Sequence, residues 1–326
     1  MGLLALALLG GCSDPGEQLD RTPHHPSEDG APVVDANEVR IPAAYEGALV
    51  IDPGWDGPVL EHDGTFLAAS KLEHALRYTA IDSAGNVLWA AERPPECTGF
   101  TITETAQGRA LAVLTDTAAE STTASAYDLK TGKVVWGPIP TPGPHHGPGL
   151  VFGTHGEDAN PNLQRTTLDP TTGRPSARSA ALADGTSIIG EHHETLLLLD
   201  GPVFSAHAGT GTTLWSTDLS DAGWSSENEV LVENIDSRSG LITLRLDEST
   251  HALIDMHDGS VEAKAVHGTA TDLATETRLI LQERTLEAFS ASGQRLWSPT
   301  RRPGDNDRWR RRGTGLPGQW QDDRRS

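Results

Sequence analysis

Short apolar runs alternate with turn-forming residues along most of the chain, and no long helical period separates them. Within several runs apolar and polar residues alternate, which is the pattern of strands with one buried face. The strand-like runs cover residues 48–52, 57–62, 65–70, 109–114, 187–189, 195–199, 230–234, 241–246 and 278–282. This patterning predicts an all-β protein.

One short pattern recurs six times: an apolar stretch, usually an Asp, a glycine turn, and four residues later a Trp or a small residue. The turn glycines are Gly85, Gly132, Gly173, Gly211, Gly259 and Gly293, spaced 34 to 48 residues apart. The outgoing strands carry Trp89, Trp136, Trp215 and Trp297, whereas Ala177 and Ala263 replace the Trp in two copies. A strand-turn-strand repeat with a period near 40 is typical of β-propeller blades.

The residues of each copy suit a tight hairpin. The Asp side chain can accept hydrogen bonds from the turn backbone, and the Gly can adopt the positive φ that the turn needs. The Trp then stands at a fixed distance from the turn and can bury roughly 150–250 Å². We therefore expect the glycines in outer hairpin turns and the Trp side chains between neighbouring sheets.

These residues resemble the tryptophan-docking repeat of the quinoprotein-like (PQQ-like) β-propellers, A-x-D-x-x-T-G-x-x-x-W, over residues 44–300. The best copy contains Asp128, Thr131, Gly132 and Trp136, while His207 and Ser290 replace the Asp in two others. The resemblance implies a β-propeller of about six four-stranded blades. Propellers of this family usually have seven or eight blades, so the alternative is a truncated ring. If six blades close, residues 48–52 should pair near residues 295–298.

Both chain termini differ from this middle part. Residues 1–12 form an apolar run ending in Leu9-Gly10-Gly11-Cys12, which resembles a bacterial lipoprotein signal with Cys12 as the lipidated residue, although no Lys or Arg precedes it. The alternative is an apolar N-terminus with an accidental cysteine. Residues 13–43 have the Pro-rich, acidic composition of a solvated linker, which includes His24 and His25. Residues 301–326 are Arg-rich and predict a disordered tail or an out-of-frame end.

Charge and cysteine content exclude some functions. The chain has 46 acidic and 25 basic residues, a net charge of −21, which repels phosphate backbones, so we expect no nucleic-acid partner. The two cysteines cannot form a disulfide framework. Quinone-dependent dehydrogenases with this repeat carry a vicinal disulfide and a calcium-bound cofactor pocket, and this chain has no vicinal cysteines.

The sequence contains no recognised catalytic motif: no G-x-S-x-G, phosphate-binding glycine loop, H-E-x-x-H or C-x-x-C. It predicts no catalytic, cofactor-binding or metal-binding residues. We interpret the pairs His145-His146 and His192-His193 as loop histidines, with metal binding as the alternative, and Cys97 as an inert thiol, with a redox-active thiol as the alternative. Asp221, Glu227 and Glu229 are interpreted as loop charges.

Two functions from different classes follow. The first is a non-catalytic binding or scaffold propeller, anchored by lipid on the extracytoplasmic side of a bacterial membrane and presenting loops to a protein, peptide or glycan. In fold and anchoring it resembles the BamB-type lipoproteins that help to assemble outer-membrane proteins. The second is an extracytoplasmic enzyme with its site at the propeller channel mouth. Converging acidic and His residues would favour the enzyme, and a Ser-, Thr- and Ala-lined channel would favour the scaffold.

Overall fold

A computed structural model describes residues 19–26, 30–35, 39, 49–95, 99–118, 121–153, 165–236, 239–272, 275, 277–282, 285–290 and 293–298. The chain divides into two compact units, treated separately below: unit 1 contains Met1–Ala183 and Gly190–Leu196, and unit 2 contains Asp184–Ile189 and Leu197–Ser326. Among the described residues no helix has the length and apolar content needed to cross a membrane. The predicted lipid-bearing Cys12, Cys97 and the Arg-rich residues 301–326 lie outside the described part.

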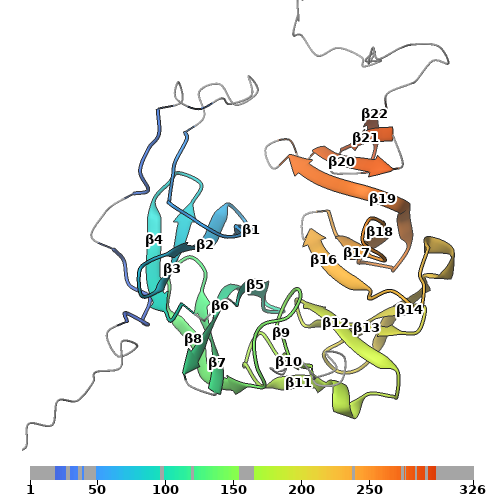
Figure 1. The fold of residues 1–326 in the computed structure, drawn as a ribbon, viewed down its shortest axis with the longest axis horizontal. Helices are drawn as coiled ribbons and strands as arrows, with labels where there is room; N and C mark the ends of the chain where they lie inside the picture. The colour runs from blue at the N-terminus through green and yellow to red at the C-terminus, as the bar shows by residue number, and fades with distance from the viewer. Residues whose placement is uncertain are drawn as a thin grey trace, which may run out of the picture. The chain divides into compact units, whose positions relative to one another are not determined.

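Unit 1 consists of antiparallel sheets whose strands lie side by side in chain order (Figure 1). The first sheet contains β1 (Leu60–His62), β2 (Thr65–Lys71), β3 (Leu76–Asp82) and β4 (Val87–Arg93). The second contains β5 (Phe100–Glu104), β6 (Ala110–Ala118), β7 (Ser121–Asp128) and β8 (Val134–Thr141). The third contains β9 (Val151–Phe152), β10 (Thr166–Leu168) and β11 (Pro175–Arg178), followed by the short 3₁₀ helix η3 (Ser179–Ala181).

The fourth sheet contains β12 (Thr186–His192), β13 (Thr195–Asp200), β14 (Val203–Ala208) and β15 (Thr213–Asp218), and the boundary between the units passes through β12 and β13. Unit 2 continues with the 3₁₀ helix η4 (Ser220–Ala222) and a seven-stranded sheet. Its strands are β16 (Leu231–Asp236), β17 (Leu241–Arg245), β18 (His251–Asp255), β19 (Val261–Asp272), β20 (Thr277–Gln282), β21 (Thr285–Phe289) and β22 (Arg295–Trp297).

The all-β prediction is confirmed, and three of the sheets are four-stranded antiparallel meanders, the sheet type of propeller blades. The expectation of separate four-stranded sheets for the fifth and sixth copies is wrong. The twelve-residue strand β19 pairs with β18 through its first half and with β20 through its second half, with a register shift between Val266 and Gly268. One continuous strand thus closes one repeat and opens the next. The third sheet has three strands in the described residues.

The described part of the predicted linker packs against the first sheet. The Ala31 N–H donates to the Gly85 carbonyl at 3.0 Å, and Ala31 is buried in a small cluster beside Ile81. His24 forms a β-bridge with Ala90. This packing differs from the expectation of a solvated tether because apolar residues interrupt the polar composition. The described residues 49–52 likewise pair with the linker and not with a sheet, since the Asp52 N–H donates to the Pro32 carbonyl at 2.9 Å.

In each outer hairpin, the size of the residue at the Trp position is matched by the size of its cross-strand partner. Each Trp faces a cross-strand alanine, in the pairs Trp89–Ala80, Trp136–Ala126, Trp215–Ala206 and Trp297–Ala288. In the two copies without a Trp, Ala177 faces Thr167 and Ala263 faces Leu253. A large side chain therefore faces a small one in the Trp copies, and the partner is larger where the Trp is absent. Close packing between sheets requires this kind of volume compensation.

Three indoles dock on the turn of the following repeat. The indole N–H donates to the carbonyl next to the motif Asp, in the pairs Trp89–Leu129 (2.8 Å), Trp136–Pro170 (2.7 Å) and Trp215–Met256 (2.7 Å). All three side chains are at most 8% exposed. A Cβ added to the turn glycine would strike the indole, at 2.9 Å for Gly132, 2.7 Å for Gly173 and 2.5 Å for Gly259. These glycines are therefore needed both for backbone conformation and for close approach of the ring.

The turns that receive an indole differ from the others in hydrogen bonding. In the receiving turns the Gly N–H donates four residues back, in the pairs Gly132–Asp128, Gly173–Asp169 and Gly259–Asp255. In the other turns it donates three residues back, in the pairs Gly85–Asp82, Gly211–Ala208 and Gly293–Ser290. The receiving turns are thus one residue longer than the other three outer turns. The turn between β16 and β17 also closes four residues back, from Gly240 to Asp236, but nothing described lies within 4 Å of a Cβ added to Gly240, so this turn length does not by itself imply indole docking.

Trp297 does not share the burial expected for the four Trp side chains. It is 39% exposed, although it stands opposite Ala288 in the same register as the docked indoles. The docked indoles each lie against the turn of a following copy. No turn of that kind follows Trp297 in the described residues, because these stop at Ser298.

Candidate functional site at the first hairpins of the sheets

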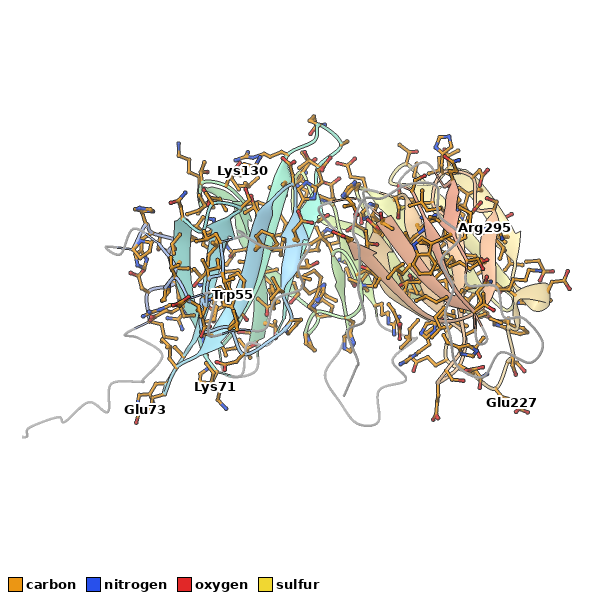
Figure 2. The ribbon with its side chains drawn as sticks, turned by 90° about the horizontal axis from the view of Figure 1, so that it is seen from above. Trp55, Lys71, Glu73, Lys130, Glu227 and Arg295 are labelled. Carbon is orange, nitrogen blue, oxygen red and sulfur yellow. The ribbon has the colours of Figure 1, made fainter. Side chains whose placement is uncertain are left out.

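Two hairpins with related sequences join the first two strands of their sheets. Residues 61–65 read Glu-His-Asp-Gly-Thr between β1 and β2, and residues 191–195 read Glu-His-His-Glu-Thr between β12 and β13. In a meander the first and third hairpins lie at the same end of the sheet. Figure 2 shows Lys130, in the β7–β8 turn, and Lys71, at the end of β2, at opposite ends of the strands. The Lys130 ammonium lies 3.0 Å from Asp63, which places the β1–β2 hairpin at the Lys130 end.

Both hairpins have positive φ at their two central residues, the backbone of a type I′ turn. The values are 48° at Asp63 and 72° at Gly64, and 47° at His193 and 67° at Glu194. The second turn is unusual because neither of its central residues is glycine. In both hairpins the leading glutamate holds the turn: Glu61 accepts the Gly64 N–H at 2.7 Å, and Glu191 accepts the Glu194 N–H at 2.8 Å.

The histidines of the two hairpins meet within unit 1. The His192 and His193 rings are stacked with centroids 3.6 Å apart, and the His193 ring approaches His62 edge-on at 6.4 Å. His62 Nε2 lies 3.1 Å from Glu104 Oε2 at the end of β5. The side chains of His62 and Glu104 are 19% and 24% exposed, so the group is reachable from solvent.

Glu194 connects this group to two further hairpins by hydrogen bonds. Its Oε1 accepts the Ala106 N–H of the β5–β6 hairpin at 3.3 Å and the Thr171 hydroxyl of the β10–β11 hairpin at 2.8 Å. Hairpins of four sheets therefore converge on one set of polar side chains. We call His62, Glu104, His192, His193 and Glu194 the hairpin cluster.

Glu191 lies beneath the hairpin cluster and is 2% exposed. Its Oε2 accepts the Leu150 N–H at 2.8 Å, while Oε1 accepts the Glu194 N–H, so one carboxyl joins the loop between β8 and β9 to the β12–β13 hairpin. Burial raises the pKa of Glu191 to about 7, against the lowering effect of these two backbone donors. Gly149 allows this approach, because a Cβ added there would lie 2.5 Å from Glu191 Oε2.

The buried imidazoles are held in their neutral form at neutral pH. Burial, followed by the neighbouring His193 and His62, lowers the pKa of His192 to about 3. Burial also lowers the pKa of His193 and of His145, whose Nε2 donates to the Gly149 carbonyl at 2.6 Å. A neutral imidazole can accept a proton or a hydrogen bond, and the His62–Glu104 pair has the arrangement of an oriented general base. Within the described ranges no three His, Cys, Asp or Glu residues are arranged to hold a metal ion.

The glycines, histidines and acidic residues named from the sequence lie in different parts of the structure. All six turn glycines have positive φ; five of them lie between the last two strands of a sheet, and Gly259 lies between β18 and β19 within the seven-stranded sheet. His192 and His193, interpreted from sequence as loop histidines, belong to the hairpin cluster, whereas Asp221, Glu227 and Glu229 are exposed in unit 2. Sequence reasoning missed Glu61, His62, Glu104, Glu191 and Glu194. The recurrence of Glu-His-X-X-Thr at residues 61–65 and 191–195 is the signal that could have found the two hairpins.

Similarity to known proteins is found among solved structures. No family model matches the chain, and no curated protein matches it. Among solved structures, BamB from Moraxella catarrhalis is 16% identical over 74% of this chain and 71% of its own, with a TM-score of 0.36. The dihydro-heme d1 dehydrogenase NirN is 12% identical over 89% and 70%, with a TM-score of 0.41. AztD from Citrobacter koseri is 12% identical over 74% and 70%, with a TM-score of 0.38. At these scores the fold description rests on the strand pairing of this chain itself.

Proposed function

We propose that this chain is an extracytoplasmic β-propeller module that binds a protein, peptide or glycan partner and is anchored to a bacterial membrane through a lipid on Cys12. The repeated outer hairpins, spaced like propeller blades and linked by docked indoles, support the propeller. The apolar run that ends at Leu9-Gly10-Gly11-Cys12 supports the anchor. The observation that carries the binding role is the hairpin cluster, where the hairpins of four sheets bring partly exposed polar groups together.

Anchoring is tested by the mass of the mature N-terminus and by membrane fractionation of the full chain and its Cys12→Ser variant. We expect an acylated N-terminal Cys12 and a membrane-bound protein, and release of the Cys12→Ser variant from the membrane fraction. A soluble chain that retains Met1 would overturn the anchor.

Partner binding is tested by site-specific photo-crosslinking in the native host. A photoreactive amino acid replaces Glu104 in the hairpin cluster, and the matched control replaces Lys71 at the opposite end of the first sheet. We expect a discrete crosslinked species from position 104 and none from position 71. Equal crosslinking from both positions, or none from either, would contradict binding at the hairpin cluster.

A second candidate is an extracytoplasmic enzyme, because acidic and His residues do converge at the hairpin cluster. His62 beside Glu104 could remove a proton from a bound nucleophile. The test is a panel of ester, phosphoester and glycoside substrates, assayed with the wild-type chain and with His62→Gln. Turnover that falls at least about a hundredfold in His62→Gln would support the enzyme, as loss of a general base does. Absence of turnover would exclude these three reaction classes.

A further inference from the structure

Part of the predicted linker runs along the outer edge of the first sheet, where β4 is the last strand. Residues 20–24, which we call the N-terminal strap, lie antiparallel to β4. The Glu92 N–H donates to the Asp20 carbonyl at 2.7 Å. His24 and Ala90 exchange both of their backbone hydrogen bonds, at 2.9 and 3.0 Å. The N-terminal strap therefore pairs with the first sheet as a further edge strand.

Contacts at both ends of β4 give the direction in which this segment runs. Arg93, the last residue of β4, is buried and donates from Nη1 to the Arg21 carbonyl at 2.8 Å. At the other end of β4, the Ala31 N–H donates to the Gly85 carbonyl in the β3–β4 turn. The chain thus reaches the first sheet at the end of the β2–β3 hairpin and runs toward the end that carries the hairpin cluster.

Side chains of the N-terminal strap pack on the first two sheets. Arg21 Nε donates to Asp116 Oδ2 at 2.7 Å, near the β6–β7 hairpin. Pro23 lies where the first docked indole meets its turn, since a Cβ added to Gly132 would lie 2.9 Å from both Pro23 Cβ and Trp89 Cγ. The N-terminal strap therefore belongs to the packed structure of unit 1, and the free tether ends where the strap begins.

This attachment shortens the chain that separates unit 1 from Cys12. Residues 13–19 lie between Cys12 and Asp20, and a chain of this length spans at most about 28 Å and on average about 15 Å. The seven residues of β4 extend over about 23 Å. A linker free over residues 13–43 would instead reach about 30 Å on average. Because the shorter tether is on average shorter than the sheet, it keeps the hairpin-cluster end away from the point of attachment.

From this geometry we propose that unit 1 stands on the membrane with its β2–β3 hairpin facing the lipid headgroups and its hairpin cluster directed away from the bilayer. The β2–β3 hairpin presents the exposed polar side chains Lys71, Glu73 and His74, which suit contact with a headgroup layer and not insertion into the apolar core. The inference rests on the proposed acylation of Cys12. It specifies that a partner of the hairpin cluster approaches from the aqueous side.

Energy transfer from a fluorophore on the protein to acceptor lipids measures the orientation. The full chain carrying Cys97→Ser is coupled through Cys12 to a maleimide lipid in phosphatidylcholine vesicles. A donor is attached through an azide-bearing amino acid at position 73 or, in a matched protein, at position 130. Figure 2 shows Glu73 and Lys130 at opposite ends of the strands. We expect the donor at position 130 to lie about 20 Å farther from the bilayer. Equal distances, or a closer approach of position 130, would overturn the proposal.

Two insertions distinguish the N-terminal strap from the rest of the linker. A Gly-Ser segment of about 20 residues between Ser13 and Asp14 lengthens the free tether to about 30 Å, and should remove most of the difference between positions 73 and 130. The same segment between Ala36 and Asn37 follows the strap and should leave that difference unchanged. Equal effects of the two insertions would mean that the strap does not fix the chain, and would overturn the proposal.

Failure of the anchor is distinguishable from failure of the orientation. The mass of the mature N-terminus from the native host reports acylation of Cys12 independently of the vesicle measurement. An unacylated Cys12 would refute the anchor and with it the orientation in the cell. An acylated chain whose two donors lie equally far from the bilayer would refute the orientation alone.

Discussion

Replacing Glu191 with Gln should change how the stability of the fold depends on pH. The buried carboxyl accepts two backbone N–H groups, from Leu150 and Glu194, and its pKa rises to about 7 because of burial. A glutamine offers only one oxygen, so its NH₂ group would face one of these donors. An unsatisfied buried donor costs about 1–3 kcal/mol.

The sign of the pH effect follows from the raised pKa. The folded state holds the Glu191 proton up to about pH 7, whereas the unfolded chain releases it near 4.5, so between these values the folded state binds more protons. Stability contributed by Glu191 is therefore complete below about pH 4.5 and is lost as the pH rises to 7. At about 1.36 kcal/mol per pKa unit, the loss is about 3 kcal/mol.

The assay is urea unfolding followed by circular dichroism at pH 4.5, 5.5, 6.5 and 7.5. The free energy of unfolding of the wild type minus that of Glu191→Gln should fall by about 3 kcal/mol across this range. Taking this difference cancels the opposing contributions of His145, His192 and His193, whose pKa values are lowered by burial. Glu61→Gln, measured at pH 7.5, reports the loss of the same turn hydrogen bond at a partly exposed site. A wild-type-minus-Gln difference that stays constant within about 0.5 kcal/mol would refute the raised pKa.

Two further predictions concern packing. Trp89→Ala should lower the free energy of unfolding by about 3–5 kcal/mol, whereas Trp297→Ala, which removes an exposed indole, should change it by less than about 1 kcal/mol. Urea unfolding measures both changes. Equal effects of the two substitutions would contradict the difference in docking. Gly149→Ala should be at least about 3 kcal/mol less stable than Gly54→Ala in the same assay. Both glycines have positive φ, but a Cβ added at position 149 would strike Glu191, whereas one added at position 54 meets nothing within 4 Å among the described residues. Similar losses of stability in the two variants would argue against the close approach of Gly149 to Glu191.

The outer hairpins could be predicted from sequence because their signal is local. Asp, Gly and Trp at fixed spacing determine the turn, its cap and the outward strand, and these need no knowledge of distant residues. The Asp128 carboxylate does accept the Thr131 N–H and hydroxyl at 2.9 and 2.7 Å. The loss of a Trp is accompanied by a larger residue at the cross-strand position, as in the pair of Ala263 with Leu253.

The hairpin cluster could not be predicted in the same way because it depends on long-range contacts. His62 and His193 are 131 positions apart in sequence, and only the meander topology brings their hairpins to one end of the sheets. Composition also misled the interpretation of residues 13–43. Ala31 packs beside Ile81 despite its Pro-rich and acidic surroundings, and the short run Ala31-Pro32-Val33-Val34 gives no periodic signal.

A double-mutant cycle between Trp215 and Gly259 in unit 2 tests whether an indole packed on the glycine of the next turn joins neighbouring repeats. In the wild type, Gly259→Ala introduces backbone strain at φ +77° of about 1–2 kcal/mol, and an overpacking cost of about 1–3 kcal/mol, because the new Cβ lies 2.5 Å from the indole. In a Trp215→Leu background only the strain should remain. Gly211, with φ +88° and nothing within 4 Å of an added Cβ among the described residues, is the matched control.

The measurement is the coupling energy from urea unfolding of the four proteins in each cycle. If the indole lies against the turn glycine, the coupling should be about 1–3 kcal/mol between Trp215 and Gly259, and less than about 0.5 kcal/mol between Trp215 and Gly211. If Gly259→Ala destabilises the protein equally with and without the indole, the two residues do not touch, and docking of Trp side chains on glycine turns does not hold the repeats together.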